Sequence, residues 1–212
     1  MNDTFMKERP VFPLILSMAM PMVISMLVNS LYNIVDSYFV ASISEEAMTA
    51  LSLVYPIQNL INAITIGFGV GINATIAFYL GAQRKEQADR AASAGFFINA
   101  VQSLILMIIC LLVMPGFLRL YSKDTGVIDY ALRYSRIVFA FAVMISFSLS
   151  FEKIFQAVGR MKVSMVSLMA GCISNIILDP LLILGAGPIP SLGVTGAAIA
   201  TVTAQFIVMS IL

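Results

Sequence analysis

Apolar residues occur in this chain as long runs, and short polar segments separate the runs. A membrane-spanning helix needs about 20 predominantly apolar residues, and about six runs reach that length. The runs lie at about 11–39, 48–80, 91–115, 127–151, 163–184 and 193–212. The pattern therefore predicts an all-α integral membrane protein that folds as a six-transmembrane-helix bundle.

Glycines, prolines and charged residues mark the expected ends of these spans. Segment 81–90 is the most hydrophilic stretch of the chain and is predicted to be a solvated loop. Pro115-Gly116 is expected to end the third span. Segment 152–162, which contains Lys153, is predicted to be the loop after the fourth span, and 185–192 a turn before the last. These boundaries leave no Lys or Arg in the middle of a span.

Composition agrees with a membrane protein. Hydrophobic residues make up 60% of the chain and charged residues only 11%, whereas a soluble domain has about 25% charged residues. The formal net charge of +1 argues against a nucleic-acid partner, which requires a basic excess. The absence of histidine removes the commonest metal ligand and general base. The first apolar run is too long for a cleaved signal peptide, so we expect it to be retained.

The distribution of Lys and Arg predicts the orientation, because cytoplasmic loops of membrane proteins carry an excess of both. The N-terminal tail and the second and fourth loops hold eight, namely Lys7, Arg9, Arg84, Lys85, Arg90, Lys153, Arg160 and Lys162. The opposite side holds four, namely Arg119, Lys123, Arg133 and Arg136. We therefore expect a cytoplasmic N-terminus and a location in the cytoplasmic (plasma) membrane.

Two acidic residues stand inside apolar runs, Asp36 in the first and Asp179 in the fifth. An ionisable group at membrane depth costs roughly 2.5–3.5 kcal/mol on insertion scales. In the predicted topology both spans run outward, and both acids lie in the outer half of their span. The matched depth of Asp36 and Asp179 predicts a shared site.

Carboxamides accompany both acids. Asn29, Asn33 and Asp36 are spaced i, i+4, i+7 and share one face of a helix, and Asn175 and Asp179 share another. Carboxylate and carboxamide oxygens are hard ligands that suit a cation such as Na⁺, and a carboxyl group in apolar surroundings could equally hold a proton. The alternative is a set of hydrogen bonds that only join helices.

Other polar and small residues give weaker signals. Thr201 and Gln205 share a face of the last span and could line a cavity. Tyr134, near the start of the fourth span, is expected at the membrane interface. Gly67 and Gly71 are spaced for close packing between membrane helices. The fourteen methionines suit a core and also a cavity that accepts many shapes.

Several motifs are spread from about residue 10 to the end of the chain. They are Pro21 with LYNIVDSYFV at 31–40, ALSLVYPI at 50–57, GFGVG at 67–71 with LGA at 80–82, FQAVG at 155–159, NIILDP at 175–180 and GVTGAAIATV at 193–202. Together they resemble the N-terminal half of the multidrug and toxic compound extrusion (MATE) transporters.

The resemblance implies a six-helix lobe that pairs with a second lobe around a central cavity, as one lobe of a twelve-helix pseudo-two-fold transporter. The implied activity is export of organic, often cationic, drugs in exchange for Na⁺ or H⁺. The implied cation site has Asp36 and Asp179, with Asn175 and Thr201 as oxygen ligands and Tyr134 nearby. Asn29 matches a position that is often polar in such transporters, and Asn33 and Gln205 are expected as further supporting or cavity residues from the helix faces that they share with Asp36 and Thr201. No cofactor is expected beyond the coupling ion, and the partners are the lipid bilayer, small-molecule drugs and the second lobe.

The chain is shorter than such transporters, which have about twelve spans, so we expect the C-terminal lobe to be missing and transport to require it. A lipid-linked saccharide flippase of the same superfamily is an alternative, although it would need basic residues within the bundle. An intramembrane aspartyl protease is a distant alternative, because two acids could share a proton. The contexts Val35-Asp36 and Leu178-Asp179-Pro180 do not fit that class.

Overall fold

The computed structural model describes residues 10–185 and 190–212, and seven helices account for most of them. The N-terminal tail with Lys7 and Arg9, and part of the turn expected at 185–192, lie outside the described residues. The helices are α2 (Val11–Ala41), α3 (Glu45–Gly81), α4 (Lys85–Tyr121), α5 (Thr125–Ala140), α6 (Ala142–Ala157), α7 (Met161–Ile183) and α8 (Val194–Ile211).

Five of these helices are long and apolar enough to cross a membrane. The pair α5 and α6 forms a sixth span if it is taken as one unit, with a bend of 48° at Phe141. The prediction of an all-α membrane bundle is therefore confirmed. The bend was not predicted, because neither proline nor glycine stands next to Phe141.

Side-chain caps begin two of the helices in the short connections. Ser44 accepts a hydrogen bond from the backbone N–H of Ala47 at 3.1 Å at the start of α3. Asp124 accepts from the N–H of Gly126 at 2.8 Å at the start of α5. Such caps satisfy backbone donors that have no partner within the helix. Polar residues between the apolar runs therefore begin helices as well as form loops.

Two predicted boundaries are wrong. The third span does not end at Pro115, because α4 continues to Tyr121 with this proline inside it; membrane helices tolerate proline when neighbours satisfy the freed backbone groups. The segment predicted as a loop from residue 152 begins as helix, because α6 continues to Ala157. Gly159, at φ +75°, ends that helix, since a left-handed residue is a common helix terminator.

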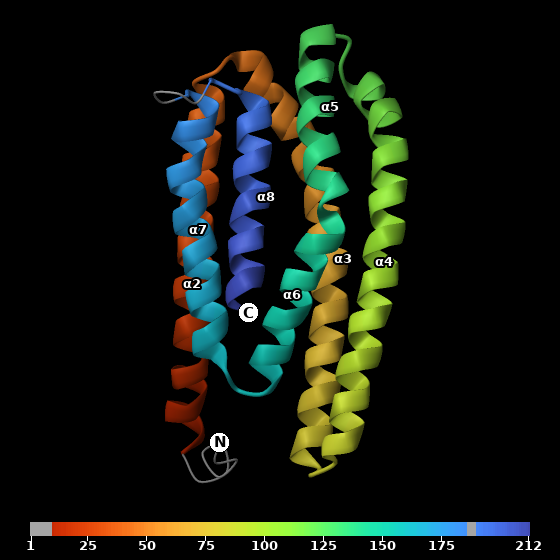
Figure 1. Cartoon of the computed structure of the whole chain (residues 1–212), viewed down its shortest axis with the longest axis vertical. Coiled ribbons are helices and arrows are strands. Elements are labelled where there is room, and N and C mark those ends of the chain that lie inside the picture. Colours follow the sequence, from red (N-terminus) through yellow and green to blue (C-terminus); the bar gives the residue numbers. More distant parts are fainter. Residues whose placement is uncertain (1–9, 186–189) are drawn as a thin grey trace.

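The helices form two groups that α8 connects (Figure 1). On one side α7 packs against α2 and α8, and on the other α3 packs against α4, α5 and α6. Helix α8 also contacts α5, and its small residues Gly196, Ala197 and Ala200 are buried. Close packing of small residues is the usual way in which membrane helices approach each other.

Gly67 and Gly71 do not pack as predicted. A Cβ atom added at either position would meet no atom within 4 Å among the described residues. Gly69 is the glycine of this motif that faces the interior, where it lies against the stem of Lys153. The prediction that Gly67 and Gly71 pack closely against another helix is therefore wrong among the residues that the structure describes.

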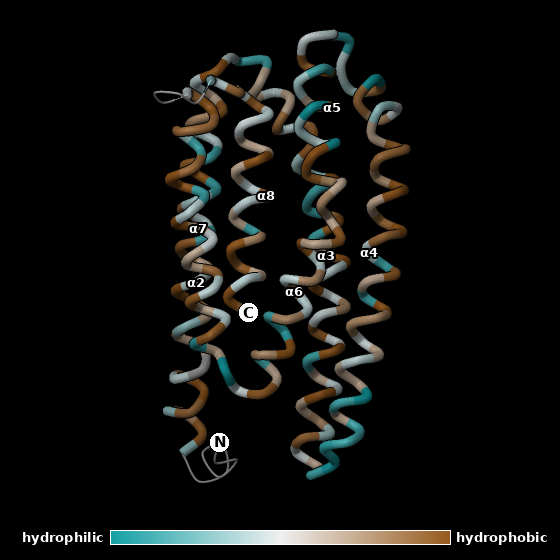
Figure 2. The backbone as a smooth tube through the Cα atoms, in the orientation of Figure 1, coloured by the Kyte–Doolittle hydropathy of each residue, from teal (hydrophilic) through white to brown (hydrophobic). Residues whose placement is uncertain are grey.

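Large apolar side chains cover much of the outer surface. Figure 2 shows hydrophobic residues along most of the length of α2 and α4, and hydrophilic residues around the α3–α4 connection. Phe78, Phe97 and Leu112 are among the exposed side chains. A soluble protein rarely exposes such a surface, so the chain is an integral membrane protein whose outer surface meets lipid.

Candidate cation site and an adjoining cavity

Helices α7 and α8 hold Asn175, Asp179 and Thr201 together. Asp179 is 0% exposed and Asn175 is 1% exposed. With its carboxamide oriented to satisfy both neighbours, Asn175 donates to Asp179 Oδ2 at 2.9 Å and accepts from the backbone N–H of Thr201 at 3.3 Å. The hydroxyl of Thr201 donates to the carbonyl of Ala197 at 3.0 Å, which leaves its oxygen able to accept or to bind a cation.

Helix α2 packs against α7 and brings a second buried carboxylate to this cluster. Asp36 is 8% exposed, and its charge repels that of Asp179. One oxygen of each acid, Oδ1 in both, is buried without a hydrogen-bond partner among the described residues. An unpaired buried carboxylate is costly unless it binds a cation or takes a proton. The two acids therefore fit a site for Na⁺ or H⁺.

The chemical type of the available ligands indicates which kind of cation the site suits. Within the part of the chain that the structure describes, no group of three or more His, Cys, Asp or Glu residues could hold a metal ion. The available ligands are two carboxylates together with carboxamide and hydroxyl oxygens, which are hard donors. They suit a weakly bound monovalent cation better than a transition metal, which prefers imidazole or thiolate.

A cavity of about 340 Å³ opens beside Asp36. Its polar lining also includes Asn33, Tyr134 and Thr201. Tyr134, predicted at the membrane interface, is instead 3% exposed inside the bundle, beside the side chains of Thr201 and Gln58. The interfacial prediction fails because α5 turns this residue toward α8 rather than toward lipid.

Sequence reasoning missed four polar residues of this cavity, namely Tyr32, Ser37, Tyr55 and Gln58. Tyr32 stands four residues before Asp36, on the same helix face, which was an available signal. Gln58 is a polar residue inside an apolar run, which was another. Nothing in the sequence predicted that this part of α3 would lie beside Asp36 of α2.

The remaining predicted residues lie at the edge of the cluster. The Asn33 amide donates to the carbonyl oxygen of Asn29 at 2.8 Å and to its Oδ1 at 3.0 Å, and both asparagines are exposed. Asn29 and Gln205 line a smaller cavity of 20 Å³ that also reaches Asn175 and Thr201. Thr201 therefore borders both cavities, and Asn29 lines only the smaller of the two.

A larger cavity of 400 Å³ lies between α2, α3, α6 and α7. Methionines from α2 and α7 line it, namely Met22, Met26, Met161 and Met165. Its charged residues are Glu152 and Lys153, and Gln156 lies beside them. The prediction that Lys153 belongs to a loop is wrong, because α6 carries it and its side chain is only 14% exposed.

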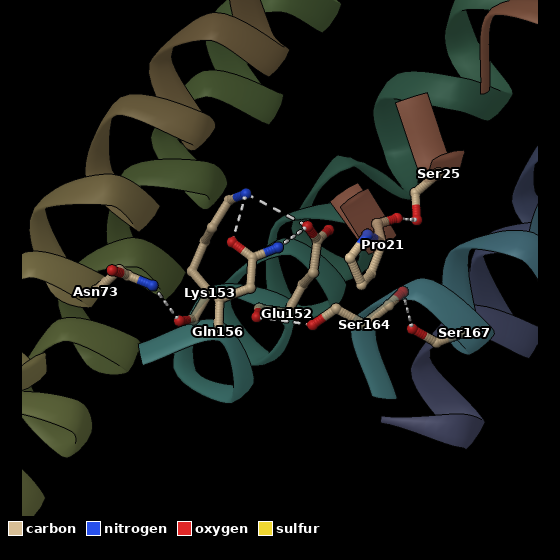
Figure 3. Close-up of polar contacts among 8 residues, drawn as sticks. All are labelled: Pro21, Ser25, Asn73, Glu152, Lys153, Gln156, Ser164 and Ser167. Atoms are coloured by element: carbon tan, nitrogen blue, oxygen red, sulfur yellow. Dashed lines mark hydrogen bonds and ion pairs between the residues drawn. The ribbon is translucent and has the colours of Figure 1, made fainter. Parts of the chain in front are cut away.

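Figure 3 shows the hydrogen bonds of this charged pair. Lys153 Nζ lies 3.3 Å from Glu152 Oε1 and donates to Gln156 Oε1 at 3.1 Å. Gln156 Nε2 donates to Glu152 Oε1 at 2.6 Å. The backbone carbonyl of Lys153 accepts from Asn73 at 2.8 Å, and that of Glu152 accepts from Ser164 at 3.3 Å. These bonds tie α6 to α3 and to α7.

A family model described as MatE matches residues 21–181, which is well over half of the chain and includes Asp36 and Asp179. The chain belongs to the MatE family. The resemblance drawn from its motifs is therefore confirmed. This family is one of transporters and not of enzymes, which excludes the aspartyl protease alternative.

Named relatives of this MatE chain share about a quarter of its residues. A FAD transporter of Shewanella oneidensis is 26% identical, over 95% of this chain and 45% of the relative. A multidrug export protein MepA of Staphylococcus aureus is 27% identical, over 93% and 43%. A solved multidrug resistance MATE family transporter of the MOP superfamily, in its outward-facing conformation, is 29% identical with a TM-score of 0.87, over 93% and 43%.

The MatE chain thus spans less than half the length of the relatives it matches. The structural match covers nearly all of this chain but 43% of the solved transporter. The bundle therefore has the fold of one lobe of a MATE transporter, as the sequence predicted.

Proposed function

We propose that this chain is the N-terminal lobe of a cation-coupled exporter of organic compounds. The observation that carries the proposal is the pair of buried acids, Asp36 and Asp179, each with an unpaired oxygen among the described residues. The multidrug export function named for its relatives supplies the export half of the proposal. A second lobe would complete the central cavity.

The acids would couple cation binding to a conformational change. Asp36 comes from α2, whereas Asp179, Asn175 and Thr201 come from α7 and α8. A bound Na⁺ or H⁺ would remove the repulsion between the two carboxylates and favour the arrangement in which α2 stays against α7. A cation can shift a conformational equilibrium only through such a difference in affinity between the two states.

The test is efflux of a fluorescent dye from vesicles that contain the two-lobe transporter, with Na⁺ and pH gradients imposed separately. We expect one gradient to drive efflux and Asp179→Asn to lower the rate at least about ten-fold, because the amide cannot take the charge-neutralising role of the carboxylate. Asp89→Asn, at an exposed position of α4, is the matched control and should transport normally. Unchanged coupling in Asp179→Asn would contradict the proposed site.

A second candidate is transport of anionic compounds, including lipid-linked saccharides. The sequence argued against it because no basic residue was expected within the bundle, but Lys153 lies in the cavity of 400 Å³, beside Glu152, and an anion would have to compete with that carboxylate. A relative named as a FAD transporter also carries an anionic compound. Failure of both gradients to move a cationic dye, together with movement of an anionic one, would favour this candidate.

We also propose that the N-terminus is cytoplasmic and that the lobe resides in the plasma membrane. The support is the predicted excess of Lys and Arg on one side of the bundle. Arg84, Lys85 and Arg90 lie at the α3–α4 connection, which Figure 1 places at the same end of the bundle as the start of α2.

A further inference from the structure

The Glu152–Lys153 pair lies inside a cavity with an otherwise uncharged lining. Among the residues that line the 400 Å³ cavity, these two are the only charged ones in the described part of the chain. The side chains are 8% and 14% exposed respectively. The charges cancel, so the cavity carries no net charge from the side chains that line it.

Two residues of the neighbouring helix α3 determine where the side chain of Lys153 lies. Its stem lies over Gly69, where an added Cβ would stand 2.8 Å from Lys153 Cγ. Its backbone carbonyl accepts the hydrogen bond from Asn73, also on α3. A larger residue than glycine at position 69 would push the stem away, so α3 makes room for this lysine and directs it into the cavity.

The contact between the two charges is long. Charge-assisted N–H···O bonds are usually about 2.7–2.9 Å, whereas Lys153 Nζ stands 3.3 Å from Glu152 Oε1 and nearer to Gln156 Oε1. The shortest bond to Glu152 comes instead from Gln156, at 2.6 Å. The ammonium group is therefore held by an uncharged neighbour as well and can leave the carboxylate without losing every partner.

We propose that Lys153 is an internal counter-ion of Glu152 and that this pair sets the charge selectivity of the cavity. The inference rests on the proposed function and names its substrate class. A simple organic monocation must displace Lys153 and leaves a net positive charge in a poorly solvated site. A zwitterionic compound places its cation at Glu152 and its anion at Lys153, and its apolar body contacts the methionines. Zwitterionic amphiphiles are thus favoured over monocations of the same size.

The test compares two probes with the same triphenylphosphonium head, tetraphenylphosphonium as the monocation and (4-carboxybutyl)triphenylphosphonium as the zwitterion. Binding of each to the full chain in lipid nanodiscs is measured by isothermal titration calorimetry. Wild type should prefer the zwitterion. Lys153→Gln should bind tetraphenylphosphonium about ten-fold more tightly and the zwitterion about ten-fold more weakly, the effect of one hydrogen bond to a charged group.

Two further variants complete the design. Lys162→Gln removes the same charge at an exposed position of α7, outside the cavity, and should leave both affinities unchanged. Lys153→Met keeps the apolar stem over Gly69 and repeats the test if Lys153→Gln does not fold. Glu152→Gln should weaken binding of both probes, because each presents its phosphonium to this carboxylate.

The outcomes separate the two proposals. If both probes bind and Lys153→Gln or Lys153→Met leaves their affinity ratio as in wild type, the role of Lys153 is refuted while the exporter proposal stands. If neither probe binds wild type and neither gradient drives dye efflux, the proposed function itself fails. A reversal of preference in the Lys153 variants, with Lys162→Gln unchanged, supports the inference.

Discussion

At the residue scale, the side chain of Asn175 connects two of the three helices of the candidate cation site, α7 and α8. Its amide donates to Asp179 on its own helix, and its oxygen accepts from the backbone of Thr201 on α8. This bridge fixes one oxygen of Asp179 and leaves the other, Oδ1, without a partner among the described residues. Oδ2 of Asp179 therefore takes part in the hydrogen bonds between α7 and α8, and Oδ1 is available for a ligand.

Asn175→Ala should lower the free energy of unfolding by about 1–3 kcal/mol, because it leaves Asp179 Oδ2 buried without the amide that donates to it. Chemical denaturation of the detergent-solubilised chain measures this loss. Asn59→Ala, at an exposed position of α3, should change stability by less than about 0.5 kcal/mol. Equal effects of the two substitutions would show that the bridge contributes nothing to folding.

At the element scale, small residues decide how closely the helices approach. A Cβ at Gly196 would overlap the backbone carbonyl of Leu182, so α8 can lie against the end of α7 only with glycine there. Gly67 faces open space, although Gly67 and Gly71 are small residues four positions apart, as Gly196 and Ala200 are. The spacing of small residues therefore indicates a possible contact, and the direction of the helix face decides whether one forms.

Gly196→Ala should destabilise the bundle by about 1–3 kcal/mol, because the backbone of Leu182 cannot move aside as a side chain could. Gly67→Ala should leave stability unchanged or raise it by up to about 1 kcal/mol, since alanine favours helix over glycine. Thermal unfolding of the two variants in the same detergent gives the comparison. A loss of stability in Gly67→Ala equal to that in Gly196→Ala would contradict this account.

At the scale of the whole molecule, α4 crosses the full height of the bundle and carries a polar connection at each end. The α3–α4 connection is rich in basic residues, and the α4–α5 connection is poorer in them. This asymmetry predicts which end faces the cytoplasm.

Gln87→Cys and Lys123→Cys place a thiol at exposed positions beyond opposite ends of the apolar part of α4. In intact cells, a membrane-impermeant maleimide should label Lys123→Cys, and it should label Gln87→Cys only after permeabilisation. The natural Cys110 and Cys172 are buried, so the unsubstituted chain provides the background. The reverse labelling pattern would place the N-terminus outside.

The amino-acid sequence by itself determined the fold class of this protein. Long apolar runs can satisfy their backbone in lipid only as helices, so the membrane bundle follows from hydropathy. Asp36, Asn175 and Asp179 were recognisable because polar groups are expensive at membrane depth. The motifs around them predicted the family that the comparisons then showed.

Only the tertiary structure decided which side chains meet. Lys153 lies four residues before the end of α6, and its charge near the end of an apolar run is typical of a loop residue. Gly69 of α3 leaves space for its stem, and the carboxylate of Glu152 attracts its ammonium group, so the side chain points into the bundle. The bend at Phe141, the burial of Tyr134 and the open face of Gly67 likewise depend on neighbouring helices. Hydropathy reports how much of a helix avoids water, whereas the partner of each face depends on contacts between segments far apart in the chain.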